Sequence, residues 1–205
     1  MSAPSPAQDP LAQIMVEHRA FRDRTRSFSE AVGRYEALVG TVPLDAELVA
    51  EFSTFLADDV DRRHGAKEEE GLFPALARHV PSDGGPVGML LQEHEELRGF
   101  QRALSQAAGR LTSDAEDPET QRTVLRSAGE VHQLLDLHID KEETVLFPMA
   151  REILSPGDLA SVAEAFLAVD ERMGPVTLSN AGGGGSQLPP FCAAGRARRD
   201  RAERA

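Results

Sequence analysis

The chain has 205 residues, and its 34 acidic against 22 basic residues give a formal net charge of -12. This charge makes nucleic acids and anionic membrane surfaces poor candidate partners, because they carry the same sign of charge. The single cysteine, Cys192, excludes an internal disulfide and any metal site built from several thiolates.

The N-terminal region resembles neither a signal peptide nor a membrane anchor. No apolar run approaches the roughly 20 residues that span a bilayer, and no basic segment precedes an apolar one near the N-terminus. We therefore expect a cytoplasmic protein. Residues 1–9 are rich in Pro, Ser and Ala, a composition that predicts disorder.

The first helix is predicted to begin at Pro10, where Asp9 can cap it and proline suits the first turn. Apolar residues recur along it at steps of three and four, and His18 lies on their side of the helix. A second helix is predicted from about Leu44 to His79, with a kink at Pro74 because proline cannot continue the hydrogen-bond ladder.

Three further helices follow. A glycine-containing loop at residues 81–86 precedes a third helix over residues 87–111, and a fourth is predicted from residue 118 to about residue 153. A short fifth helix should run from Ser155-Pro156-Gly157-Asp158 to about Met173. The apolar stripes on these segments predict an all-α, up-down four-helix bundle with a short fifth helix.

The C-terminal region differs in composition from the helical part. Residues 174–205 contain four consecutive glycines and a cluster of arginines, and such a segment cannot bury a core. We therefore divide the chain into a disordered N-terminus over residues 1–9, a bundle over residues 10–173, and a flexible Gly/Arg-rich tail over residues 174–205.

Two stretches inside the bundle repeat one another. His64-Gly-Ala-Lys-Glu-Glu-Glu-Gly-Leu-Phe-Pro and His138-Ile-Asp-Lys-Glu-Glu-Thr-Val-Leu-Phe-Pro share His, Lys, Glu, Glu, Leu, Phe and Pro at matching positions. In each copy, a His precedes a Glu by four residues, a spacing that puts both side chains on one face of a helix. A shorter repeat, Glu17-His18 and Glu93-His94, lies on the intervening helices.

Antiparallel helices in a bundle bring their inner faces to one axis, where these repeated polar residues should meet. Burying two carboxylates without compensating charge costs several kcal/mol, and a pair of metal ions removes that cost. We predict that the two glutamates bridge two ions and that the histidines are terminal ligands. The predicted ligands are His18, His64, Glu68, His94, His138 and Glu142.

Each of these residues has an ordinary explanation when it is taken alone. A histidine on an apolar face is usually a hydrogen-bonded core residue, and a glutamate is usually solvated. The symmetric scheme favours the metal site, because four of the six histidines fall on it. His79 and His132 lie off the scheme and are predicted to be surface residues.

The residues next to the predicted ligands carry further charge. Glu69 and Glu143 lie about 100 degrees round the helix from the predicted bridging glutamates, so we expect them to be outer partners or surface residues. Candidate counter-charges for them are Arg22, Lys67, Arg98 and Lys141.

From Pro10 to Arg151, the duplicated motif with its Leu-Phe-Pro endings resembles the hemerythrin-like family, the HHE cation-binding domain. The resemblance implies a four-helix bundle that holds two non-haem iron ions between His and carboxylate side chains. Imidazole and carboxylate ligands without sulfur also suit manganese or zinc. Oxygen-carrying hemerythrins use two histidines four residues apart on the third helix, whereas Leu90 and Arg98 flank His94 at that spacing here.

One nitrogen ligand is therefore missing relative to the oxygen carriers, which predicts open metal positions and reactivity. Glu17, Glu93, Glu95 and Tyr35 are the candidates for filling the gap. A secondary hypothesis is that Leu72 and Leu146 wall an apolar pocket for a small gas.

Three functions of different classes remain open. The first is binding and activation of O2, or of nitric oxide or peroxide, at the di-iron site. The second is an iron- and O2-dependent oxidase or oxygenase acting on a small metabolite, and the third is iron storage or delivery. No catalytic residue is assigned, and we expect a monomer or a weak homo-oligomer.

Overall fold

The computed structural model describes residues 9–80 and 85–174, which are mostly helical and contain no strand. The predicted all-α fold is confirmed. Of the N-terminus predicted to be disordered (residues 1–9) and the tail predicted to be flexible (residues 174–205), all residues except Asp9 and Gly174 lie outside the described part of the chain. No helix in the described part of the chain has both the length and the apolar character of a membrane span.

The first helix, α1 (Pro10–Gly33), begins at the predicted residue. The Asp9 carboxylate accepts hydrogen bonds from the backbone N–H groups of Leu11 and Ala12, at 3.0 and 3.4 Å. These contacts satisfy two donors that the first turn leaves free, which fixes the start of the helix. A short 3-10 helix, η2 (Glu36–Leu38), then leads towards the second long segment.

The second long segment is predicted as one kinked helix. In the structure it consists of α-helical parts separated by wider, π-helical turns. The α-helical parts are α2 (Ala46–Phe55) and α3 (Phe73–Ala77). Between them lie two π-helical stretches, η3 (Leu56–Gly65) and η4 (Glu68–Leu72).

A wide turn precedes the proline in each copy of the repeat. The N–H of Phe73 bonds to the carbonyl of Glu68, and the N–H of Phe147 bonds to the carbonyl of Glu142, both five residues back. We attribute the wide turn to the proline that follows, which has no N–H and whose ring would crowd a regular turn. The irregularity that accompanies Pro74 therefore begins earlier in the helix, at the predicted ligand Glu68.

The third and fourth long segments agree with the prediction. They consist of α4 (Pro86–Leu111) and of α5 (Pro118–Lys141), which continues through π-helical η5 (Glu142–Leu146) into α6 (Phe147–Ile153). Finally, α7 (Pro156–Met173) starts with a capping box, in which Ser155 and Asp158 each bond the other's backbone N–H.

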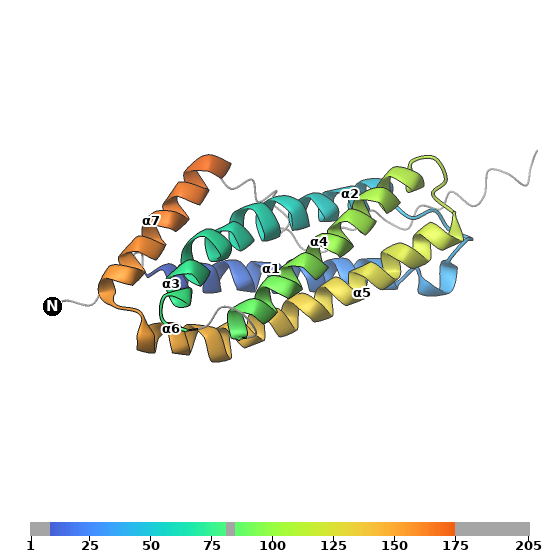
Figure 1. The fold of residues 1–205 in the computed structure, drawn as a ribbon. Coiled ribbons are helices and arrows are strands. Elements are labelled where there is room, and N and C mark those ends of the chain that lie inside the picture. Colours follow the sequence, from blue (N-terminus) through green and yellow to red (C-terminus); the bar gives the residue numbers. More distant parts are fainter. Residues whose placement is uncertain (1–8, 81–84, 175–205) are drawn as a thin grey trace, which may run out of the picture. The chain divides into compact units, whose positions relative to one another are not determined.

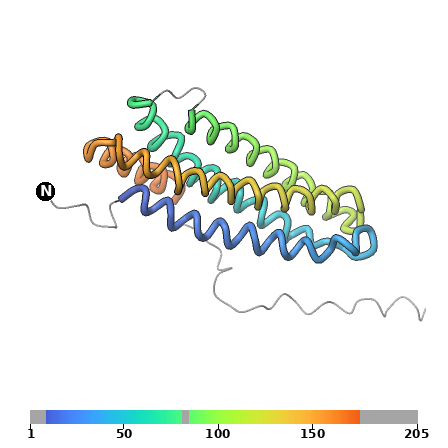
Figure 2. The backbone as a smooth tube through the Cα atoms, turned by 90° about the horizontal axis from the view of Figure 1, so that it is seen from below, coloured from blue at the N-terminus to red at the C-terminus, as the bar shows by residue number. Residues whose placement is uncertain are grey.

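The four long segments run side by side (Figures 1 and 2). α4 packs against α5 and α2, α1 packs against α5, and α7 lies against α1, η3 and η4. The buried apolar side chains form two clusters. One contains Phe28, Phe52, Leu104 and Ile139. The other contains Leu11, Leu72, Leu146 and Phe166.

Replacing Leu104, which is fully buried, by Ala should lower the free energy of unfolding by about 2–5 kcal/mol. The loss combines reduced apolar burial with an unfilled cavity. Denaturant unfolding of the metal-free protein measures it. Leu167→Ala is the matched control, because that leucine is 60% exposed and its loss should cost much less. Equal losses in the two variants would contradict the assigned core.

A candidate metal centre between the helices

The six side chains predicted as metal ligands come together inside the bundle, and all six are buried. They form two overlapping groups of four, in each of which one ligand atom per residue lies within 4.8 Å of the others. One group contains His18, His64, Glu68 and Glu142. The other contains Glu68, His94, His138 and Glu142.

The Glu68 carboxylate faces both groups. Its Oε1 atom lies 3.4 Å from His64 Nε2, and its Oε2 atom lies 3.2 Å from His94 Nε2. A carboxylate that gives one oxygen to each group has the arrangement needed to bridge two cations.

Glu142 repeats this arrangement from the opposite side. Its Oε1 atom lies 3.3 Å from His138 Nε2, and its Oε2 atom lies 3.1 Å from His18 Nε2. The internal sequence repeat therefore produces a repeat in space, with each group receiving one oxygen from each glutamate.

Several of these buried atoms lack a hydrogen bond. Among the described residues, both carboxylate oxygens of Glu68 and Glu142 and the Nε2 atoms of His18 and His64 have no hydrogen-bond partner. The contacts of 3.1 to 3.4 Å between them bring the atoms close without hydrogen-bond geometry. Unpaired buried polar atoms are destabilising, and a coordinated cation would satisfy all of them. The donor set, imidazole nitrogen with carboxylate oxygen, fits a non-haem iron site.

An outer carboxylate lies within hydrogen-bonding distance of the Nδ1 atom of every one of the four histidines. The distances are 2.9 Å for His18–Glu143, 2.9 Å for His64–Glu17, 2.7 Å for His94–Glu69 and 2.9 Å for His138–Glu93. A proton held on Nδ1 leaves the Nε2 lone pair facing the interior of the site. Such outer carboxylates fix the orientation of a histidine ligand and raise its basicity.

Glu17 and Glu93 therefore do not fill the ligand position that is missing relative to the oxygen carriers. They lie behind His64 and His138 as Nδ1 partners. The repeated Glu-His pair was the available signal for this role, but each glutamate serves the histidine of another helix rather than its neighbour in sequence. Glu69 and Glu143 take the expected outer positions.

The outer carboxylates are in turn paired with basic side chains. Lys67 Nζ lies 2.7 Å from Glu17, and Lys141 forms the equivalent ion pair with Glu93. Arg98 Nη2 lies 2.7 Å from Glu69, and Arg22 Nη1 lies 3.9 Å from Glu143. Arg98 and Arg22 therefore face the two glutamates for which they were predicted as counter-charges. Lys67 and Lys141 do not, because they pair with Glu17 and Glu93 instead.

The remaining candidates lie away from the site. Tyr35 packs against the apolar cluster that contains Phe28. Glu95 is exposed and pairs with Arg98 at 2.6 Å. His79 is exposed as predicted, whereas His132 is half-buried, with its Nδ1 atom 3.3 Å from the Thr25 hydroxyl.

The repeated Leu-Phe-Pro sequence covers one side of the histidines. The Phe147 ring stacks on His18 at a centroid distance of 5.7 Å, and Phe73 stacks on His94 at 5.8 Å. Leu72 and Leu146 are completely buried in the adjoining apolar cluster. They do not line the small pocket between η3 and α4 that includes His94.

The two central carboxylates raise the pKa of histidines that face them. Burial alone would lower the pKa of His64, but Glu68 and Glu17 raise it to about 10. Burial likewise opposes protonation of His138, whose pKa Glu142 and Glu93 raise to about 9. Burial would raise the pKa of Glu68, yet His64 and His94 hold it well below its usual value. The interior therefore attracts positive charge, which either protons or metal ions can supply.

The sequence was compared with known proteins. A profile of the hemerythrin HHE cation binding domain matches residues 9–150. Proteins named iron-sulfur cluster repair protein YtfE, from Escherichia coli O1:K1 and from Escherichia fergusonii, are each 24% identical over 147 residues. The similarity covers 69% of this chain and 66% of each relative, so the chain spans just under two thirds of their length.

Replacing Glu68 by Gln should reduce the metal content of the purified protein by more than half, because an amide NH2 replaces one of the two donor oxygens and both groups lose the shared negative charge. Elemental analysis after dialysis measures this. Glu70→Gln is the matched control, since Glu70 is exposed and pairs with Arg172 at the surface. Full metal retention in the Glu68 variant would contradict the assignment of Glu68 as a shared ligand.

Metal binding at pH 7.5 should release protons. His64 and His138 have pKa values of about 10 and 9 in the metal-free fold, so both hold a proton at this pH that a metal ion must displace. The affinity for the metal should therefore rise with pH until the pH exceeds the pKa values of both histidines. Calorimetry with Zn²⁺ in buffers of different ionisation enthalpy counts the protons, and zero release would contradict the proposed Nε2 ligation.

Proposed function

Because the chain belongs to the hemerythrin HHE cation-binding domain family, we propose that it is a non-haem di-iron protein that binds and activates O2 or a related small oxidant. Nitric oxide and peroxide are the related ligands. The observation that carries the proposal is the pair of overlapping ligand groups that share the buried carboxylates of Glu68 and Glu142.

The proposed ligand set assigns two histidines to each iron and both glutamates to the pair. His18 and His64 hold one ion, and His94 and His138 hold the other, with Glu68 and Glu142 between them. A pair of iron ions at such a site supplies two electrons to a small oxidant. The four outer carboxylates keep the imidazoles oriented, and the stacked phenylalanines limit the entry of water.

The charge of the site supports an anionic or readily reduced ligand. Two carboxylates do not neutralise two divalent cations, and the outer glutamates are already paired with basic side chains. The resulting excess of positive charge favours a small ligand that is anionic or becomes anionic on reduction.

The name of the relatives provides a second candidate function. They are named for iron-sulfur cluster repair, and a protein that carries iron at a paired site could supply iron for such repair. An oxidase or oxygenase is the third candidate, and the pocket beside His94, with a volume of about 20 Å³, would admit only a small molecule. Cytoplasmic location stays a prediction.

Metal analysis combined with spectroscopy tests the main proposal. The protein as purified should contain about two irons per chain, and admitting O2 to the anaerobically reduced protein should produce a visible absorption change. Zinc in place of iron, or iron whose spectrum does not respond to O2, would contradict the oxidant function. Iron that passes from the reduced protein to an apo-ferredoxin with no response to O2 would instead support the repair function.

A further inference from the structure

The internal repeat gives the two halves of the site the same residue types, but the structure does not cover them equally. Lys67 and Lys141 occupy equivalent places, each paired with the glutamate that contacts a histidine. The Lys67 side chain is 1% exposed, whereas that of Lys141 is 33% exposed. The half that contains His18 and His64 is therefore sealed at a point where the other half is open.

Helix α7 causes the difference. Its Asp170 carboxylate lies 2.9 Å from Lys67 Nζ and 3.1 Å from Arg63 Nη1, and the ring of Phe166 lies 6.0 Å from the same lysine nitrogen. Arg172 adds an ion pair with Glu70 at 2.8 Å. These contacts attach α7 to η3 and η4 and cover Lys67, the lysine that pairs with Glu17.

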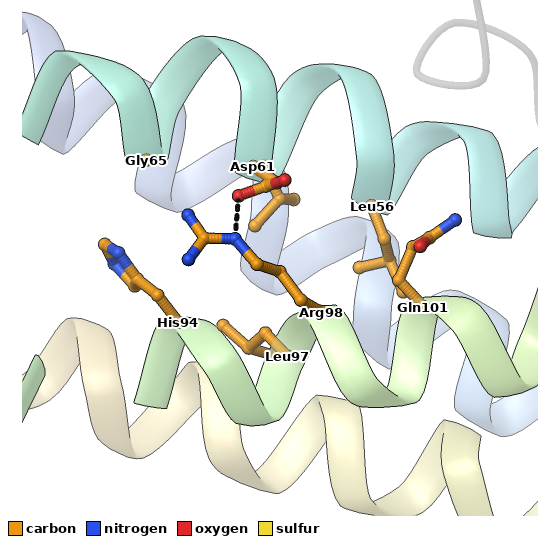
Figure 3. A pocket seen from close by; sticks show the side chains of 8 residues that line it. Leu56, Asp61, Gly65, His94, Leu97, Arg98 and Gln101 are labelled. Carbon is orange, nitrogen blue, oxygen red and sulfur yellow. Dashed lines mark hydrogen bonds and ion pairs between the residues drawn. The ribbon is translucent and has the colours of Figure 1, made fainter. Parts of the chain in front are cut away.

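A small pocket lies between η3 and α4, beside His94, which at 6% is the most exposed of the six predicted ligands (Figure 3). Its volume of about 20 Å³ suits one water molecule or a small ligand of similar size. His94 forms part of its wall, and so does Arg98, whose Nε atom lies 2.7 Å from Asp61. The other lining residues are Leu56, Val60, Gly65, Leu97 and Gln101.

We propose that the position between His94 and His138 is the one that takes an exogenous small ligand, that this pocket is its route of entry, and that Gly65 sets the size of the route. The inference rests on the proposed function. It assigns different roles to two metal positions that the repeated sequence makes alike.

Gly65 is placed to set the width of the route because it faces His94 across the pocket. A Cβ atom added at this residue would lie 3.9 Å from His94 Cε1 and 3.8 Å from Asp61 Oδ1, with the Val60 carbonyl 3.4 Å away. These are ordinary van der Waals distances, so alanine fits without moving the backbone. The methyl group would instead occupy the space beside Cε1, the atom bonded to the Nε2 that faces the metal position.

The test compares azide binding to the oxidised, iron-loaded full chain with and without this methyl group. The azide-to-iron absorption band should report a dissociation constant about tenfold higher or more in Gly65→Ala, the size of effect expected from overpacking a filled site. Gly129→Ala is the matched control, because a Cβ there meets nothing within 4 Å and adds the same helix propensity. Its azide affinity should equal that of the wild type.

A crystal structure of the wild-type azide complex provides the second measurement, which does not depend on the variant. Azide on the His94–His138 side, with its free end in the pocket, is the expected result. Azide on the His18–His64 side, or equal affinity in Gly65→Ala and wild type, would overturn this inference and leave the di-iron proposal intact. A wild-type protein that holds no iron pair would overturn the proposed function itself.

Discussion

The structure depends on two carboxylates, Glu68 and Glu142, that are buried at the centre of a helical bundle without hydrogen-bond partners among the described residues. Such groups are tolerated only beside positive charge. In the metal-free fold, protons on the facing histidines supply it, as the raised pKa values of His64 and His138 indicate. Two metal ions would supply it more completely, because they also satisfy the unpaired oxygens.

The residues around the six predicted ligands continue this pairing of opposite charges towards the surface. Each histidine contacts an outer glutamate through Nδ1, and each outer glutamate faces a lysine or an arginine. The alternation of sign orients the imidazoles and limits the cost of so many buried charges. Apolar clusters that contain Phe28 and Leu72 surround this polar region and supply most of the buried apolar surface.

Much of this arrangement could be predicted from local spacing. His64 with Glu68, and His138 with Glu142, lie four residues apart, and helical geometry alone places each pair on one face. Contacts between helices could not be predicted in this way. Glu17 serves His64 rather than the adjacent His18, and His132 is half-buried against Thr25. The coverage of Lys67 by α7 also depends on tertiary packing that no motif records.

The central claim is that two metal ions lie between Glu68 and Glu142. Anomalous diffraction from crystals of the iron-loaded protein, recorded on both sides of the iron absorption edge, tests it most directly. The account predicts two iron peaks, one beside His18 and His64 and the other beside His94 and His138. A single peak, or peaks away from the two glutamates, would contradict it.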